Sequence, residues 1–277
     1  MSRAAVLGSP IAHSLSPVLH RAGYRALGLA ETWSYDRFEV DEAGLPGFLA
    51  ALDVAGEGWA GLSLTMPLKR AVIPLLDEVG PTALAVDAVN TVLFAPDGRR
   101  TGDNTDVPGL VAALRERGVT RVESAAVLGA GATASSALAA LGQLCDGVVT
   151  AYVRGPERAA QMHALGDRLG VKVATAPWDR AAEAFATPLT ISTTPVGATD
   201  SLSAGVPQAP GALFDVLYHP WPTALAQAWA QRGGIVLGGL DLLVHQAVLQ
   251  FEMFTGVSPA PLAAMRAAGE AALAGRP

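Results

Sequence analysis

The chain has 277 residues, of which 51% are hydrophobic and 16% charged, and its formal net charge at pH 7 is −6. This length is sufficient for one large domain or two modest ones with a buried core. The acidic balance argues against a general nucleic-acid binder, which needs a basic face. A single cysteine, Cys145, excludes both an intramolecular disulfide framework and a cysteine-rich metal site.

The uncharged stretch from Ser124 to Cys145 approaches the length of a membrane span. Glycines and hydroxyl residues interrupt it, so it is better interpreted as a strand, a turn and a helix. The residues after Met1 give only a short apolar run, and no signal peptide is predicted. We therefore expect a cytoplasmic protein without membrane contacts, in which Cys145 is a buried structural thiol rather than a nucleophile.

The first third of the chain alternates strand and helix patterns, which favours a mostly parallel sheet. Ser16 and Pro17 are typical of a helix start, with Ser16 as the N-cap and Pro17 in the first helical position. The expected strands are 4–8, 33–38 and 61–65, and a further helix is expected from about 67 to 79.

A second alternation begins near Val122 and is typical of a doubly wound nucleotide-binding domain. Its strands are expected at 125–128, 148–153, 171–174, 189–194, 213–217 and 235–237. Two final helices, near 240–255 and 261–274, are expected to pack on the first domain, because the second sheet is already complete. The predicted fold class is α/β, with an N-terminal α/β domain (1–106 and 240–277) and a Rossmann domain (107–239).

A glycine loop follows the first strand of the second alternation and opens a helix. Its two glycines permit a tight turn and let a pyrophosphate approach the N–H groups of the helix start. Such loops also occur in methyltransferases and flavoproteins, and a plain strand-to-helix turn is the structural alternative. The residues expected to bind a dinucleotide are Gly129, Ala130, Gly131, Ala132 and Ala134.

The end of the next strand carries Arg154 and Arg158, where NAD-binding domains usually place an acidic residue for the ribose 2′-hydroxyl. A guanidinium matches the oxygens of a phosphate bidentately, so this segment favours NADP. The alternative for Arg158 is a solvated charge on a helix. Arg154 is the firmer prediction of the two.

Lys69 lies just inside a helix that follows an expected strand, and Asp106 lies in a dense polar loop. A lysine and a carboxylate that converge on one hydroxyl can manage its proton while hydride leaves the carbon. An exposed lysine is the ordinary alternative, Asn90 with Thr91 could form a turn, and Ser14 and Ser16 could be helix caps.

Taken together, these motifs and their order resemble the shikimate dehydrogenase family over nearly the whole chain. The segments that carry the resemblance are Pro10–Pro17, Leu64–Lys69, Ala88–Thr91, Gly102–Asp106, Asp215–Tyr218 and Gly239–Ala247. The sequence departs from the family pattern at Ser63, which replaces an asparagine, at Val153-Arg154-Gly155 and at Ser192-Thr193-Thr194. The last two changes concern the cofactor site.

The resemblance implies a role for each matched residue. Lys69 and Asp106 would be catalytic, and Ser14 and Ser16 would hold a substrate carboxylate. Ring hydroxyls would be held by Thr65, Asn90 and Gln246, with Tyr218 also on the substrate. Gly239 would lie near the nicotinamide and Thr194 near the cofactor.

We therefore expect an NADP-dependent enzyme that interconverts 3-dehydroshikimate and shikimate in aromatic amino-acid biosynthesis. Its partners would be the small-molecule substrate and NADP, with neither nucleic acid nor membrane, and it would be a monomer or homodimer. No metal is expected, because the five histidines lie in separate elements. The alternatives are a quinate or aminoshikimate dehydrogenase, and a nucleotide-binding regulator without turnover.

Overall fold

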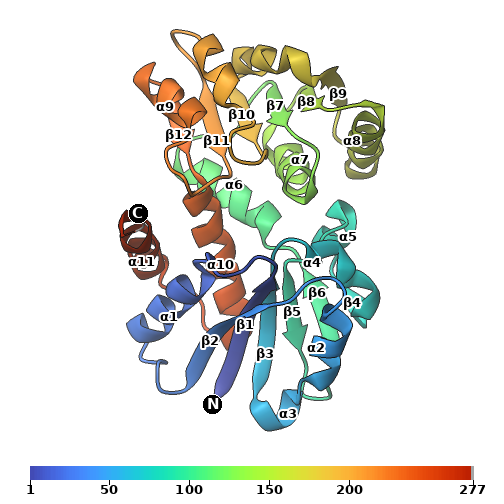
Figure 1. Cartoon of the computed structure of the whole chain (residues 1–277), viewed down its shortest axis with the longest axis vertical. Helices are drawn as coiled ribbons and strands as arrows, with labels where there is room; N and C mark the ends of the chain where they lie inside the picture. Colours follow the sequence, from blue (N-terminus) through green and yellow to red (C-terminus); the bar gives the residue numbers. More distant parts are fainter. Residues whose placement is uncertain (276–277) are drawn as a thin grey trace. The chain divides into compact units, whose positions relative to one another are not determined.

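The computed structural model describes residues 1–275, and the chain divides into two compact units (Figure 1). The first unit comprises Met1–Thr105 and the chain from Leu243 onward, and the second comprises Asp106–Leu242. Each unit contains one six-stranded sheet. The expected α/β class is confirmed.

The sheet of the first unit is mixed, with strand order β2-β1-β3-β5-β6-β4. Its strands are β1 (Ser2–Gly8), β2 (Trp33–Glu39), β3 (Trp59–Leu64), β4 (Glu78–Val79), β5 (Thr91–Phe94) and β6 (Arg100–Asp103). β1 pairs in parallel with β2 and β3, whereas β5 is antiparallel to both β3 and β6. Three of the five strand pairings are parallel, as expected of a mostly parallel sheet. The exception is β5, which connects to β6 by a short turn that favours antiparallel pairing.

Helices cover both faces of this sheet. They are α1 (Ser16–Ala26), α2 (Leu45–Ala51), α3 (Val54–Glu57), α4 (Leu68–Ala71), α5 (Pro81–Val86), α10 (Gly239–Thr255) and α11 (Leu262–Ala274), with a 3-10 turn η1 (Ile73–Leu75). Leu7 and Leu62 point to a core shared with Leu45 and Leu68, on the side of α2 and α4. Because strand side chains alternate between faces, Ser63 points to the other side, where it bonds to Gln250 of α10.

Two local expectations in this unit are wrong. The helix expected from about 67 to 79 is instead α4, η1 and β4, since Pro74 interrupts the helical pattern and Glu78–Val79 pairs with β6. Ser16, expected as the N-cap of α1, is instead the first residue of the helix. The N-cap is Leu15, and no side chain caps the helix. The final helices do pack on this unit as expected, since α11 lies against α1.

The sheet of the second unit is wholly parallel, with order β12-β11-β10-β7-β8-β9. Its strands are β7 (Ala125–Leu128), β8 (Val149–Val153), β9 (Val173–Pro177), β10 (Leu189–Ser192), β11 (Ala212–Asp215) and β12 (Ile235–Leu237). Numbered from 1 at β7 and read from the β9 edge, the strands have the 3-2-1-4-5-6 order of a dinucleotide-binding fold. Ligands of such sheets bind at the carboxyl ends of the strands, where the order reverses between β7 and β10.

The connections of this unit are α6 (Asp106–Glu116), α7 (Ala132–Leu144), α8 (Pro156–Leu169), η2 (Trp178–Ala186), η3 (Asp200–Gly205) and α9 (Ala224–Gln231). Cys145, at the end of α7, is half-buried rather than buried as expected. Burial raises the pKa of its thiol, which lowers the thiolate fraction and its reactivity.

Candidate active site

Asn90 is the centre of a bonded cluster in the first unit. Its backbone oxygen accepts from the N–H of Leu64, the residue before Thr65, at 2.8 Å. Val89 N donates to the backbone oxygen of Lys69, also at 2.8 Å. The expected motif Leu64–Lys69 is thus joined to the Asn90 segment by two backbone hydrogen bonds, so Thr65, Lys69 and Asn90 lie in one region.

The Asn90 side chain also holds the chain that enters the second unit. Its Oδ1 accepts from the backbone N–H of Thr105 at 2.8 Å, and its Nδ2 lies 3.0 Å from Thr105 Oγ1. Thr105 directly precedes Asp106, which is the first residue of α6 and is buried. Asn90 therefore does more than form a turn, because both the oxygen and the nitrogen of its side-chain amide bond to Thr105.

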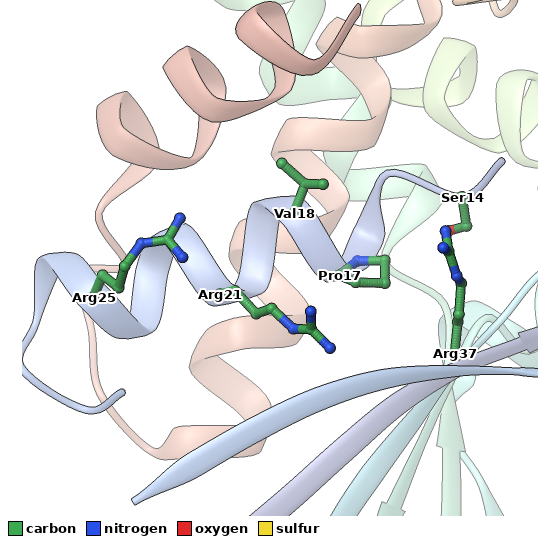
Figure 2. A pocket seen from close by; sticks show the side chains of 6 residues that line it. All are labelled: Ser14, Pro17, Val18, Arg21, Arg25 and Arg37. Atoms are coloured by element: carbon green, nitrogen blue, oxygen red, sulfur yellow. The ribbon is translucent and has the colours of Figure 1, made fainter. Parts of the chain in front are cut away.

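Ser14 and Ser16 lie at the start of α1. The N–H of Ser16 donates to Ser14 Oγ at 3.3 Å, and the Ser16 side chain is buried. Ser14 also lines a cavity of about 340 Å³ together with Arg21, Arg25 and Arg37 (Figure 2). Arg37 Nη1 donates to the carbonyl of Ala12 at 2.6 Å, so Arg37 tethers the loop that carries Ser14.

Helix α10 contributes two glutamines one turn apart. Gln246, the expected ligand, donates from Nε2 to the Leu243 carbonyl of its own helix at 2.8 Å. Gln250 was not among the expected residues, yet it bonds directly to the Asn90 carbonyl at 3.0 Å. The i, i+4 spacing from Gln246 places both on one helix face, which is the signal that could have identified it.

In the second unit the glycine loop lies where a dinucleotide fold binds its ligand. Gly129 has φ +110°, and a Cβ there would come within 2.6 Å of Thr193 Oγ1, so a side chain is excluded. Gly131 is the N-cap of α7, Ala132 begins the helix and Ala134 is buried within it. No side chain caps this helix, and a negative charge is favoured at such an N-terminus.

Arg154 follows β8, as expected, and its guanidinium lies over the ring of Trp178, 5.2 Å from the centroid. No signal in the sequence indicated this platform, since Trp178 comes from the segment after β9. Arg158, in the first turn of α8, donates to Gln161 Oε1 at 3.0 Å on its own helix. That local bond fits the alternative of a solvated charge on the helix, and the role of Arg158 as a cofactor ligand stays a prediction.

The remaining expected residues, Thr194, Tyr218 and Gly239, follow β10, β11 and β12 in turn. Thr194 is buried, with Oγ1 3.3 Å from the Ser192 hydroxyl. Gly239 N donates to the Leu217 carbonyl beside Tyr218, and a Cβ on Gly239 would lie 2.1 Å from the Val216 carbonyl oxygen. The short distance between the backbone at position 239 and the Val216 carbonyl therefore requires glycine at this position.

Asp215 supports this corner. Thr223 Oγ1 donates to its carboxylate at 2.7 Å, and Leu217 N lies 3.4 Å from the other oxygen. Burial raises the pKa of Asp215, and these two hydrogen bonds oppose that rise. Asp215 thereby fixes the turn that presents Tyr218.

Residues 1–275 contain no group of three or more histidine, cysteine or acidic side chains placed to hold a metal ion. Within the same residues, none of the helices combines the length and apolar character that a bilayer span requires.

Comparisons with known proteins cover both units. Residues 6–92 match the shikimate dehydrogenase substrate binding domain, and residues 239–268 match the shikimate 5′-dehydrogenase C-terminal domain. The shikimate dehydrogenase (NADP(+)) of Oleidesulfovibrio alaskensis is 38% identical, over 91% of this chain and 88% of its own length.

Solved structures agree. Shikimate dehydrogenase from Mycobacterium tuberculosis is 40% identical with a TM-score of 0.88, covering 98% of this chain and 100% of its own. The shikimate 5-dehydrogenase of Thermus thermophilus, solved in complex with NADP(H) and shikimate, is 34% identical with a TM-score of 0.84. That similarity covers 98% of this chain and 100% of the Thermus chain.

Proposed function

The chain belongs to the shikimate dehydrogenase family, and we propose on this premise that it interconverts 3-dehydroshikimate and shikimate with NADP(H). The reaction serves aromatic amino-acid biosynthesis. The observation that carries the proposal is that backbone hydrogen bonds join the Leu64–Lys69 segment to Val89 and Asn90. The Asn90 side chain in turn bonds Thr105, which directly precedes Asp106. A nucleotide-binding regulator would need no such arrangement.

The first unit holds the substrate. Ser14 and Ser16 donate to its carboxylate, as the paired hydroxyls at the start of α1 allow. Thr65, Asn90 and Gln246 bond the ring hydroxyls, with Tyr218 as a further contact. The Asn90 amide is held by Thr105 before substrate arrives, so little reorganisation is needed on binding.

Lys69 and Asp106 act on the oxygen at C3. When shikimate is oxidised, its C3 hydroxyl proton passes to this pair while hydride leaves C3; the reduction runs in reverse, and the carbonyl oxygen takes a proton from the pair. A cation and an anion at one oxygen both orient it and stabilise the charge that develops there.

The second unit holds the cofactor, and NADP(H), when bound, donates or accepts the hydride. Gly129, Ala130, Gly131, Ala132 and Ala134 give the pyrophosphate a close approach to the α7 N-terminus. Arg154, supported by Trp178, bonds the 2′-phosphate, with a smaller share from Arg158. Thr194 and Gly239 lie against the nicotinamide half. The glycines at 129 and 239 support this assignment, since a Cβ at either position would collide with Thr193 or with the Val216 carbonyl.

The protein acts in the cytoplasm as a monomer or homodimer. The experiment that tests the proposed reaction measures cofactor reduction by purified protein with shikimate, quinate and aminoshikimate, each with NADP and with NAD. We expect the highest kcat/KM for shikimate with NADP. A higher kcat/KM for quinate or aminoshikimate would identify the protein as a dehydrogenase of that substrate. If no substrate reduces either cofactor, the alternative of a nucleotide-binding regulator would be favoured.

A further inference from the structure

Gln250 lies at the middle of a buried chain of hydrogen bonds in the first unit. Its side chain is 1% exposed, and all three polar positions of its amide are engaged. Nε2 donates to the Asn90 carbonyl at 3.0 Å and to Thr91 Oγ1 at 2.9 Å, and Oε1 accepts from Ser63 Oγ at 2.6 Å. Because Nε2 faces two acceptors and Oε1 faces a donor, the amide has one permitted orientation.

The chain begins at Tyr35, which is fully buried on β2. Its hydroxyl donates to Ser63 Oγ at 2.6 Å. Burial raises the pKa of Tyr35 far above its usual value, while hydrogen bonds with Ser63 and Ser16 oppose the rise. The phenol therefore keeps its proton and acts as a donor. Because Ser16 also reaches this hydroxyl, the chain starts beside the group proposed to hold the substrate carboxylate.

The chain ends at Asn90. Thr91 Oγ1 accepts from Gln250 and donates to Asn90 Oδ1 at 2.8 Å. With Thr105 N also donating to Asn90 Oδ1, the oxygen of the Asn90 amide must face these two donors. The bonds therefore run in one direction, from Tyr35 through Ser63, Gln250 and Thr91 to Asn90.

The backbone brings these side chains together. Ser63 of β3 and Thr91 of β5 are direct cross-strand partners, and Gln250 from α10 bridges the pair. Ser63 stands where the family usually has asparagine. In this chain the amide that bonds both Ser63 and Thr91 comes from the helix, one turn beyond Gln246.

We propose that Gln250 is a positioning residue for the dehydrogenase reaction. It fixes the orientation of the Asn90 amide toward the substrate hydroxyl and, through Asn90 and Thr105, the backbone that enters α6 at Asp106. The inference rests on the proposed function, since Asn90 and Asp106 have their roles only there. Gln250 touches neither substrate nor cofactor, and it acts through Asn90.

The test compares three variants that remove the chain at increasing distance from Asn90. Gln250→Leu removes the bridge, Ser63→Ala removes the hydroxyl that donates to it, and Tyr35→Phe removes only the first donor. We expect the KM for shikimate to rise about tenfold in Gln250→Leu, with kcat also reduced, and by progressively less in Ser63→Ala and Tyr35→Phe. The KM for NADP should stay within about twofold in all three, since the cofactor is assigned to the other unit.

Two further variants separate positioning from folding. Leu249→Ala, on the same helix, is the matched control, which should lower Tm without changing the KM for shikimate. Gln250→Glu replaces the two donors of Nε2 by an acceptor that faces the Asn90 carbonyl, so it should raise the KM for shikimate at least as much as Gln250→Leu. If Gln250→Leu does not fold, the Tyr35→Phe and Ser63→Ala pair gives the same ranking on a smaller scale.

The outcomes are distinct. Wild-type protein that fails to oxidise shikimate contradicts the proposed function, whatever the variants do. Active wild-type protein, with a folded Gln250→Leu whose kcat and KM for shikimate are unchanged, contradicts the role of Gln250. Equal changes in the KM values for shikimate and NADP would assign Gln250 to stability alone and would also overturn the proposal.

Discussion

The candidate binding residues of the two units are held in place by different physical means. In the first unit, the candidate substrate residues are fixed by buried bonds between side chains, as at Asn90, Thr105 and Gln250. In the second, the candidate nucleotide site consists of backbone around Gly129 and one arginine on an aromatic ring, Arg154. The candidate substrate site therefore depends on the polar atoms of its side chains. The candidate nucleotide site depends mainly on backbone that glycine leaves uncovered, with Arg154 as the exception.

This difference has an energetic consequence. A buried polar group that loses its partner costs about 1–3 kcal/mol, so we expect the first site to reject a substrate that lacks a matching hydroxyl. Backbone N–H groups at a helix start favour any phosphate, so we expect the selectivity of the second site for NADP to come from Arg154. Side-chain changes should therefore alter substrate use in the first unit, whereas in the second they should alter the choice between cofactors.

The largest effect is expected at the acid–base pair. Lys69→Ala should lower kcat about 10²–10⁴-fold and change shikimate affinity much less, because a proton-transfer group acts mainly in the transition state. Asp106→Asn keeps the shape of the side chain, removes its charge and should behave similarly. Steady-state kinetics and shikimate titration of both variants measure this.

The double variant sharpens the result. Groups that act as a unit are non-additive, so Lys69→Ala with Asp106→Asn should cost less than the product of the single losses. Arg70→Ala is the matched control: Arg70 follows Lys69 on α4, pairs with exposed Asp87 and should leave kcat unchanged. A near-normal kcat for Lys69→Ala would show that Lys69 is an ordinary surface lysine and that the proposed acid–base mechanism is wrong.

The second effect concerns the cofactor. Arg154→Ala should raise the KM for NADP about tenfold or more and leave the KM for NAD nearly unchanged, since one bond from a guanidinium to a phosphate contributes about 1.5–3 kcal/mol. Trp178→Leu removes the ring beneath Arg154 and should reproduce part of this loss. Arg158→Ala, whose guanidinium bonds to Gln161, should cost less.

The result can go the other way. Equal increases in KM for NADP and NAD after Arg154→Ala would mean that the arginine supports the fold with Trp178 rather than the 2′-phosphate. The contrast between the units would then rest on backbone alone, and NADP preference would need another source in the second unit.

The sequence predicted the second unit better than the first, for a physical reason. A parallel sheet with helical crossovers has short apolar strands at regular spacing, and β7 and β12 were predicted to the residue. In the first unit, β5 and β6 pair antiparallel through a short turn, and α4, η1 and β4 follow one another within a few residues. Local periodicity does not report such pairings.

The same limit applies to the candidate sites. Motif residues such as Lys69 and Gly129 belong to contiguous sequence segments, so their positions could be predicted. Gln250 and Trp178 act through contacts with residues distant in sequence, Asn90 and Arg154, which only the folded chain brings together. The roles of the matched residues stay predictions until the variants are measured.

A third expected effect is a pH dependence of stability in the buried core of the first unit. His20 stacks on Tyr35, with ring centroids 4.0 Å apart, and burial lowers its pKa from 6.5 to about 3. Below pH 6.5 the unfolded chain binds a proton at His20 that the folded chain refuses until about pH 3. Stability is therefore lost as pH falls through this window, by about 1.4 kcal/mol per pH unit from this group.

The variant His20→Phe keeps the stacking and removes the titration. Urea unfolding at pH 7 and pH 5 should show a loss ~2 kcal/mol smaller for His20→Phe than for wild type, since the carboxylates titrate alike in both. His163→Phe, at an exposed position on α8, is the control and should match wild type. Equal losses for wild type and His20→Phe would mean that His20 accepts its proton within the folded core.

The smallest expected effect lies at the surface of the first unit, where Arg37 and Arg25 line the cavity beside Ser14 (Figure 2). Arg37→Ala removes the bond to the Ala12 carbonyl and frees the loop that carries Ser14, so the KM for shikimate should rise about two- to fivefold with kcat unchanged. Arg25→Ala removes an equal charge from the same cavity without touching that bond, and its KM for shikimate should remain that of wild type. If both variants raise the KM for shikimate equally, and added salt abolishes the difference from wild type, the arginines attract the substrate carboxylate through their charge. The first unit would then bind its substrate both by fixed side-chain hydrogen bonds and by long-range electrostatic attraction. In that respect it would resemble the second unit, where the charge of Arg154 is expected to select the cofactor.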